Sequence, residues 1–291
     1  MEKKGLTLTV VMLAESANYT EGIGNISVLK KMSRGDKRQY TYISRQALRY
    51  NIVEQAQWNS TPVALSKSVV QFAPDAKIDE YPEIDLFGYM KTTGKDDSGN
   101  NGAASTRSAV ARLSNAIALE PYQSDMDYLT NMGMARRLKD ANNGIAQSEV
   151  HRSYYSYTIS IDLDRVGIDG EIEIPNSEKA ARVQALLETI QYLYRDIKGR
   201  RENLAPIFAI GGVYDRKNPY FENRIKVEDN KIDTAPLLEI INAGEDTINN
   251  TVSGIAAGMF QNDQEVKEKL NCAGVSEVFD ELKAKVGKYY G

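Results

Sequence analysis

The side chains best placed to act on a ligand are the cations of an N-terminal stretch. Residues 28–52 hold one carboxylate, Asp36, and seven cations: Lys30, Lys31, Arg34, Lys37, Arg38, Arg45 and Arg49. The stretch has a net charge of +6 whereas the whole chain has −4, so the remaining residues carry −10. Such an asymmetry is typical of one anion-binding face on an otherwise acidic protein.

These cations surround the predicted start of a helix at Ser44. A helix N-terminus has free N–H groups and a partial positive charge, so it attracts anions rather than further cations. Seven cations within 25 residues suit a polyanion whose phosphates are spaced along a track. The interleaved Tyr40, Tyr42 and Tyr50 could stack bases or simply pack. The alternative is a solvated basic face that pairs with the acidic remainder of the molecule.

Other chemistry is poorly supported by the residues present. With one cysteine, Cys272, and one histidine, His151, the chain has no internal disulfide and no histidine or thiolate metal cluster. The segment "EGIGNIS" (21–27) lacks the third glycine of a dinucleotide fingerprint, and no P-loop follows any glycine. Carboxylate pairs such as Asp162/Asp164 alternate as on a solvated strand face. We therefore expect no catalytic residues, no metal site and no cofactor.

The elements that must position the basic stretch follow from periodicity. Alternation and β-branched or aromatic residues predict strands over 5–13, 84–90, 113–119, 154–163 and 206–214. Apolar stripes at helical spacing predict helices over 44–58, 177–198 and 263–286. The order strand, helix, strand occurs twice in succession, which is typical of an α+β, ferredoxin-like fold.

Two irregular stretches interrupt this order. Residues 91–106 are rich in Gly, Asn, Ser and Thr, and residues 121–153 form a long polar stretch. Long loops in a compact domain are usually functional. The N-terminal apolar run alternates as a strand does, with a signal peptide as the minor alternative. No apolar run approaches the roughly 20 residues of a membrane span, so we expect a cytoplasmic protein without a membrane partner.

Three segments together resemble a known family: "GNISVLKKMSRGDKRQYTYISRQALRY" (24–50), "DLFGYM" (85–90) and "RLSNAIALEPY" (112–122). They are similar to backbone subunits of type I CRISPR Cascade complexes, in the RAMP superfamily, and most of all to the DevR-type branch of type I-B systems. The similarity extends to about residue 220.

The resemblance implies a single RRM-like palm over 1–291. It further implies finger or loop insertions at 14–43 and 91–106, a thumb-like insertion at 121–153 and a helical C-terminal part at 222–291. It also implies a non-catalytic function. Several copies would polymerise along one CRISPR RNA and, with other Cascade subunits, present its guide to target DNA.

The family motif at the start of the first palm helix matches Ser44, Gln46 and Arg49, which implies that they contact the RNA backbone. The neighbouring Arg45 and the preceding loop would add contacts from Asn25, Ser27, Lys30, Lys31, Arg34, Lys37 and Arg38. Ser44 is also a good N-cap, worth about 1 kcal/mol. Gln46 has no capping role, because a capping box would place it one residue later.

The two insertions receive roles from the same resemblance. In the thumb, Met132 and Met134 would act as apolar wedges beside the guide, with Arg136 and Arg137 on phosphates. The alternative is a methionine-rich cap over a core patch. In the finger, Lys91, Lys95 and Arg107 would meet target DNA, and Arg107 is also a candidate RNA-binding residue.

Two other function classes remain open at this point. Related type III subunits cut target RNA with a loop aspartate, and Asp36 lies in a comparable loop, although "SRGDK" is also a turn sequence. A metabolic enzyme on a ferredoxin-like fold is the other, since fold does not fix function.

Overall fold

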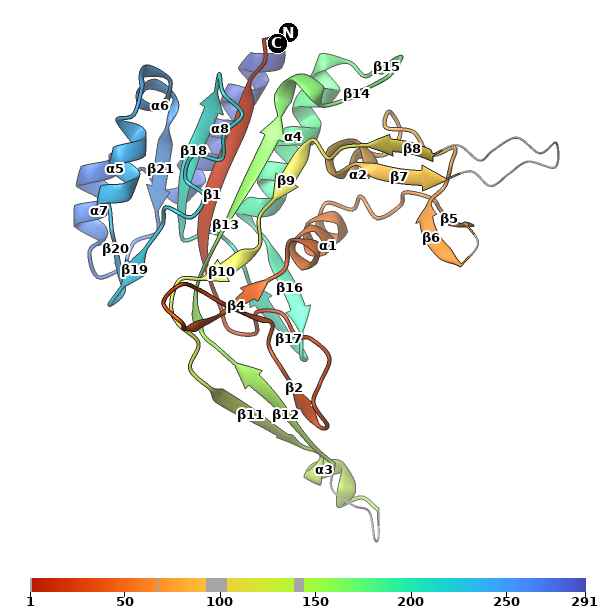
Figure 1. Cartoon of the computed structure of the whole chain (residues 1–291), viewed down its shortest axis with the longest axis vertical. Helices are drawn as coiled ribbons and strands as arrows, with labels where there is room; N and C mark the ends of the chain where they lie inside the picture. Colours follow the sequence, from red (N-terminus) through yellow and green to blue (C-terminus); the bar gives the residue numbers. More distant parts are fainter. Residues whose placement is uncertain (1, 67, 93–103, 139–143) are drawn as a thin grey trace, which may run out of the picture.

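The computed structural model describes residues 2–66, 68–92, 104–138 and 144–291. Its centre is a mixed α/β body whose main sheet runs in the order β21-β18-β1-β13-β10-β4-β3, with β9 also paired to β13 (Figure 1). The strands are β1 Gly5–Ala14, β3 Lys31–Ser33, β4 Gln39–Ile43, β9 Ala111–Leu113, β10 Ala116–Ala118, β13 Ser153–Asp162, β18 Phe208–Tyr214 and β21 Val252–Ile255.

Burial explains why β1 and β13 form the middle of this sheet. β1 is buried along nearly its whole length and pairs antiparallel with both β13 and β18. β13 alternates: Tyr155, Tyr157 and Ile159 enter one core, whereas the intervening serines and threonine face the other side. Thr158 satisfies its hydroxyl with Thr9 of the neighbouring strand at 2.7 Å. The period-two pattern of the sequence therefore sets the two faces of the sheet.

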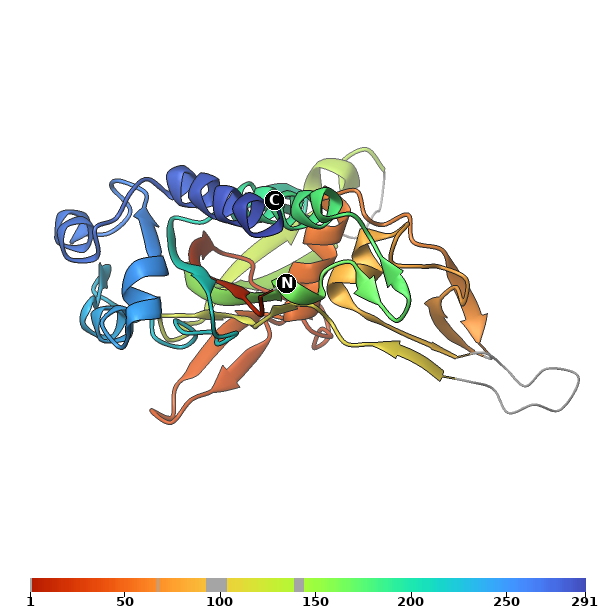
Figure 2. The ribbon, with the colours of Figure 1, turned by 90° about the horizontal axis from the view of Figure 1, so that it is seen from above.

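Three helices cover one face: α1 Arg45–Gln55, α4 Asn176–Gln191 and α8 Val275–Tyr290. Leu48 and Ile52 of α1, Leu186 of α4 and Phe279 of α8 belong to one core with Leu8 of β1. Figure 2 shows α4 and α8 side by side on this face, and the β3–β4 hairpin projecting from the other. The helix that carries the basic residues is thus fixed to the sheet by its apolar stripe.

The C-terminal segment covers part of the opposite face. Its elements are β19 Val227–Glu228, β20 Lys231–Ile232, α5 Ala235–Ile241, α6 Glu245–Asn250 and α7 Asp263–Leu270. Phe221, Ile225 and Phe260 pack there against Val11 of β1 and Phe208 of β18 in a second core. The predicted helical C-terminal part therefore packs on the central sheet and contributes its edge strand β21.

Two protrusions leave the body (Figure 1). The side protrusion contains β5 Val63–Ser66, β6 Val69–Phe72, α2 Pro82–Phe87, β7 Tyr89–Thr92 and β8 Ala104–Arg107. The long hairpin contains β11 Asp125–Thr130, α3 Met132–Ala135 and β12 Ile145–Val150, and β2 Ile26–Ser27 adds to it as a third strand. Smaller elements are η1 Leu163–Arg165, β14 Ile168–Asp169, β15 Ile172–Glu173, β16 Tyr194–Ile197 and β17 Arg200–Asn203.

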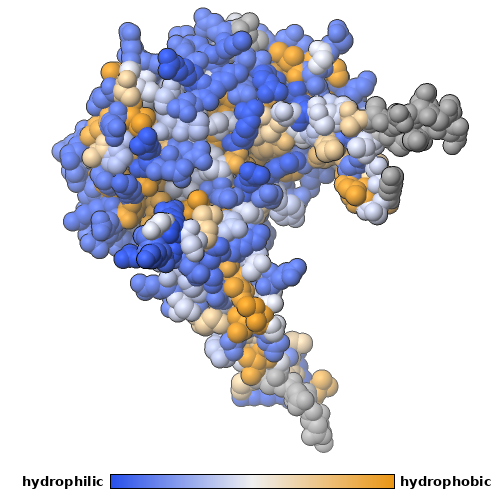
Figure 3. Space-filling model, viewed as in Figure 1, coloured by the Kyte–Doolittle hydropathy of each residue, from blue (hydrophilic) through white to orange (hydrophobic). Residues whose placement is uncertain are grey.

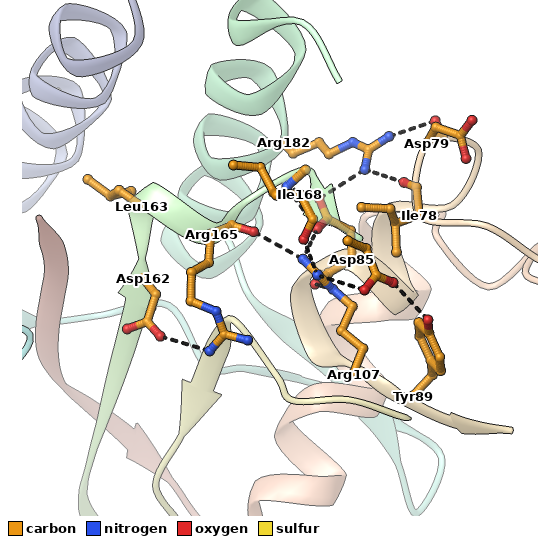
Figure 4. A network of polar contacts seen from close by, with 12 residues as sticks. Ile78, Asp79, Asp85, Tyr89, Arg107, Asp162, Leu163, Arg165, Ile168 and Arg182 are labelled. Atoms are coloured by element: carbon orange, nitrogen blue, oxygen red, sulfur yellow. Dashed lines mark hydrogen bonds and ion pairs between the residues drawn. The ribbon is translucent and has the colours of Figure 1, made fainter. Parts of the chain in front are cut away.

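A buried ion network anchors the side protrusion to the body (Figure 4). The Asp85 carboxylate of α2 is fully buried and accepts hydrogen bonds from Arg107 at 2.6 Å and Arg182 at 2.9 Å. The Gly167 N–H donates to the same carboxylate at 2.9 Å. Arg107 also donates to the carbonyl oxygens of Arg165 and Ile168. Four chain segments thus meet at one carboxylate, which fixes their relative positions.

The predicted strands over 5–13, 154–163 and 206–214 and the helix over 44–58 are confirmed, with small shifts at their ends. The strand expected over 113–119 is split into β9 and β10 around Ser114 and Asn115. No helix in the described ranges is long and apolar enough to cross a membrane.

Three predicted elements were wrong in type or extent. Most of residues 84–90 belong to the helix α2, because Pro82 suits the first turn of a helix. The helix α2 ends before Gly88, whose φ of +73° allows the chain to reverse into β7. The helix expected over 177–198 stops at Gln191, and the end of that range holds β16, the first strand of the β16–β17 hairpin. The helix expected over 263–286 is two helices, separated where Asn271 adopts a left-handed conformation with a φ of +51°.

Candidate nucleic-acid interface

Side-chain amide and hydroxyl groups cap the N-terminus of α1. Ser44 Oγ accepts from the Ala47 N–H at 3.3 Å and donates to Asn18 Oδ1 at 2.8 Å. The Arg45 N–H donates to Asn115 Oδ1 at 2.9 Å. The predicted cap at Ser44 is confirmed, and its residue is only 8% exposed. No acidic residue lies in the first turn, so the positive potential of this helix end is left uncompensated from within the helix.

The three side chains beyond the cap differ in availability. Arg45 and Gln46 are exposed. Arg49 is paired with Glu83 at 3.3 Å, and its guanidinium lies 5.2 Å from the centre of the Phe87 ring. Arg49 therefore also connects α1 to α2 of the side protrusion, and the fully presented groups at this helix start are Arg45 and Gln46.

The basic turn, residues 34–38, joins β3 to β4 and is shaped by its own aspartate. Asp36 accepts from the Arg38 N–H at 3.0 Å and from the Tyr40 hydroxyl at 2.6 Å. The Tyr40 hydrogen bond, followed by the Arg38 N–H, lowers the pKa of Asp36. Lys37 takes a φ of +64° at the tip. Arg34, Lys37 and Arg38 are all exposed, so the turn presents cations while its carboxylate holds the backbone.

Lys31, like Arg49, has a close carboxylate partner. Its Nζ lies 2.6 Å from Glu149 Oε2 of β12 and 4.2 Å from the centre of the Tyr122 ring. Glu149 also accepts from the Leu29 N–H at 2.8 Å. Burial raises the pKa of Glu149, but Lys31 and Leu29 outweigh it and leave that pKa below its usual value. Lys31 therefore joins β3 to β12, whereas the adjacent Lys30 is half-buried.

The segments expected to be a separate loop and thumb form one sheet. Ile26 and Ser27 of β2 pair in parallel with Gln147 and Ser148 of β12. The carbonyl oxygen of Asn25 accepts from the Gln147 N–H at 3.1 Å. These contacts place Asn25 and Ser27 on the stem of the long hairpin.

A cation that the sequence did not indicate lies beside this stem. Lys198, in the turn of the β16–β17 hairpin, donates from Nζ to Ser27 Oγ at 2.8 Å. The two residues are 171 positions apart, so no local pattern signals their contact.

The end of the long hairpin presents the predicted wedge residues. Met132 and Met134 of α3 are 47% and 67% exposed, and Arg136 and Arg137 beside them are exposed too. The alternative of a methionine cap over a core patch is therefore wrong. Further apolar side chains are exposed on the same hairpin, as Figure 3 shows along its length: Met126, Tyr128, Leu129, Leu138 and Ile145.

The expectation that Arg107 and Lys91 meet nucleic acid was wrong. The Arg107 side chain is only 3% exposed, because it belongs to the buried network around Asp85. Lys91 is buried as well and donates to the carbonyl oxygen of Ala76. Both cations stabilise the side protrusion from inside. Lys95 and residues 93–103 of the predicted finger lie outside the described residues.

A groove of about 590 Å³ lies between the basic residues and the C-terminal segment. Arg34 and Arg45 line it from the basic turn and the start of α1, and the C-terminal segment contributes Glu222, Asn223, Ile225 and Lys226. Its remaining lining comes from β10, from the residues just before and after it, and from β13: Ser114, Asn115, Ile117, Leu119, Ser156, Tyr157 and Thr158. Within the described ranges, no group of three or more His, Cys, Asp or Glu could hold a metal ion.

Comparison with known proteins gives a family and a fold. The family model described as "CRISPR-associated negative auto-regulator DevR/Csa2" matches residues 6–236. A chain of a solved "CRISPR RNA-guided surveillance complex" is 13% identical with a TM-score of 0.61, over 97% of this chain and 99% of that one. A chain of a "CRISPR RNA-guided surveillance complex, pre-nicking" is 11% identical with a TM-score of 0.60, over 97% and 100%. No curated protein matches. At these identities, the likeness to the solved chains concerns the fold alone.

Proposed function

The chain belongs to the CRISPR-associated DevR/Csa2 family, and on that premise we propose that it is a non-catalytic, RNA-binding subunit of a CRISPR RNA-guided surveillance complex. The observation that carries the proposal is the basic turn beside the start of α1. There, Arg34, Lys37, Arg38 and Arg45 are exposed next to a helix end without acidic residues. Two chains with this fold come from complexes named for their guide RNA.

The geometry suits a sugar–phosphate backbone better than a single phosphate. The cations are distributed over a hairpin turn and a helix start, and Lys198 and Ser27 extend the polar surface toward the long hairpin. A polyanion with regularly spaced charges can contact such positions in succession, releasing counterions as it does so. Gln46 adds an uncharged donor and acceptor beside Arg45.

The strand order supports a ferredoxin-like, RRM-like palm. In chain order β1, α1, β10, β13, α4 and β18 repeat strand, helix, strand, and the sheet places them as β18-β1-β13-β10. On this proposal, residues 14–43 and 121–153 together form the thumb-like protrusion. The side protrusion is then the finger, and residues 222–291 complete the palm.

Several copies of the chain would bind along one CRISPR RNA and hold its guide for pairing with target DNA. The exposed apolar residues of the long hairpin, among them Met132 and Met134, would act at the guide or a neighbouring copy. Other subunits of a type I-B Cascade would complete the assembly. These partners follow from the family resemblance. The exposed apolar hairpin agrees with them, because such patches commonly mark interaction sites.

The test compares the salt dependence of RNA binding by matched variants. The first variant is Lys37→Ala/Arg38→Ala/Arg45→Ala, whose residues are all exposed in or beside the basic turn. Arg49 is left intact, because its removal would leave Glu83 without its ion-pair partner. The control is Arg216→Ala/Lys231→Ala/Lys288→Ala, which removes three exposed cations outside this region.

Binding of a CRISPR RNA should weaken steeply with salt for the wild type. The slope of log K against log salt should be shallower by about two for the first variant and unchanged for the control, since each single-strand phosphate contact contributes about 0.7. Equal losses in both variants would reduce the basic turn to an ordinary charged surface. Failure of the wild type to bind RNA at low salt would overturn the proposal.

A further inference from the structure

We infer that the groove between the basic turn and residues 222–226 binds one nucleotide of the RNA, with Lys226 as a phosphate-contacting cation opposite Arg34 and Arg45. The inference rests on the proposed function and deepens it. It assigns part of the RNA-binding surface to the C-terminal segment, in addition to the N-terminal cluster of cations.

The charge of the groove favours an anion. Three cations line it, Arg34, Arg45 and Lys226, against one carboxylate, Glu222. Arg34 is oriented there by its neighbours. Its guanidinium lies 4.2 Å from the centre of the Tyr40 ring, and Nη2 donates to the Ala118 carbonyl oxygen at 3.4 Å. Cations on facing walls can contact successive phosphates on the two sides of one nucleotide.

The floor offers the other two chemistries of a nucleotide. Ile117 and Leu119 supply half-buried apolar surface that a base can cover. Asn115, Ser156 and Asn223 supply amide and hydroxyl groups, which suit a ribose 2′-hydroxyl or a base edge. Asn115 is already fixed in place, because its Oδ1 accepts from the Arg45 N–H. The volume of about 590 Å³ lies within the range of roughly 300–1,000 Å³ usual for small-molecule sites.

The wall that carries Lys226 is held firmly to the body. Phe221 and Ile225 are buried in the second core, on either side of a turn in which Asn223 adopts a φ of +61°. The Lys226 carbonyl oxygen accepts from the Asp233 N–H at 3.0 Å, next to the β19–β20 pair. Lys226 itself is exposed. Its side chain is therefore presented by a fixed backbone, which limits the entropy lost on binding.

The experiment compares Lys226→Ala with Lys231→Ala. Both lysines are exposed on the C-terminal segment and both substitutions remove one charge, but only Lys226 lines the groove. Binding of a single-stranded RNA should lose about 0.7 from its salt slope in Lys226→Ala and nothing in Lys231→Ala. In parallel, wild-type protein bound to RNA carrying 4-thiouridine is irradiated and its cross-linked peptides are identified by mass spectrometry.

Cross-links to residues 222–226 or 114–119, together with the reduced slope, would support the inference. Two results separate its failure from that of the proposed function. If the basic-turn variant loses slope while Lys226→Ala behaves as Lys231→Ala, the groove does not bind RNA although the function stands. If the wild type binds no RNA, both are overturned.

Discussion

At the scale of single residues, the role of each charge follows from its partner rather than from its type. Arg45, Lys37 and Arg38 are exposed, Lys31 is paired with Glu149, and Arg107 is enclosed around Asp85. The sequence shows only that all five are cations. It identifies the Ser44 cap because that signal is local. It misses Lys198 and Lys226, because only the folded chain brings them close to residues 27–45.

We expect the stability of the chain to depend on pH through His151. It is buried beside Thr41, whose Oγ1 lies 2.7 Å from His151 Nδ1. Burial lowers the pKa of His151, although Glu120, the Pro121 carbonyl and Asp125 oppose this. The unfolded chain then binds the proton more readily than the folded chain. The stabilising contribution of neutral His151 is therefore fully present above about pH 6.5 and is lost as the pH falls toward the lowered pKa of the folded state.

Denaturant titrations should show this loss in the wild type, with a slope of at most about 1.4 kcal/mol per pH unit. Because the chain has no other histidine, His151→Asn should remove that dependence near and just below pH 6.5. An unchanged pH dependence in the variant would show that another group is responsible.

Asp36 separates a binding role from a catalytic one. Both of its carboxylate oxygens accept hydrogen bonds within the basic turn. We therefore expect that neither the wild type nor Asp36→Ala, each bound to a CRISPR RNA, cuts an RNA complementary to that guide in the presence of Mg²⁺. Gel analysis of the RNA after incubation measures this directly. Cleavage by the wild type that disappears in Asp36→Ala would instead make the chain an endoribonuclease.

At the scale of elements, the predictable parts are the long periodic segments. β1, β13 and α1 follow from alternation or a helical stripe, and their two cores require those patterns. The short apolar run at 84–90 was predicted as a strand, and this was wrong: Pro82 at the first helical position favours α2 there. The parallel pairing of β2 with β12 joins residues about 120 positions apart, for which the sequence has no local signal.

The network around Asp85 should decide whether the side protrusion stays in place. Asp85→Ala would leave Arg107 and Arg182 buried without their shared carboxylate, which costs about 3–5 kcal/mol of unfolding free energy. Arg112→Ala is the control, since the Arg112 side chain is 46% exposed and its partner Asp162 keeps Arg165 at 3.4 Å, so the loss should be less than about 1 kcal/mol. Urea unfolding of both variants measures the difference; similar losses would mean that the buried network does not stabilise the protrusion.

At the scale of the whole molecule, the chain is a compact body with two projecting parts (Figures 1 and 2). The exposed cations of the basic turn and of the start of α1 lie on elements of that body. The exposed apolar residues gather on the projections, for instance Leu65 and Val69 at the side and Tyr128 and Leu129 on the long hairpin. Two unlike apolar surfaces on one chain suit head-to-tail contacts, which generate open filaments. This agrees with a subunit that repeats along an RNA.

Repeated binding along an RNA can be measured by counting, with native mass spectrometry, the chains bound to RNAs of different length. With one RNA twice as long as the other, we expect the saturated complex on the longer RNA to hold about twice as many copies, because each copy occupies a fixed length of backbone. The same number of copies on both RNAs, or none on either, would contradict this expectation.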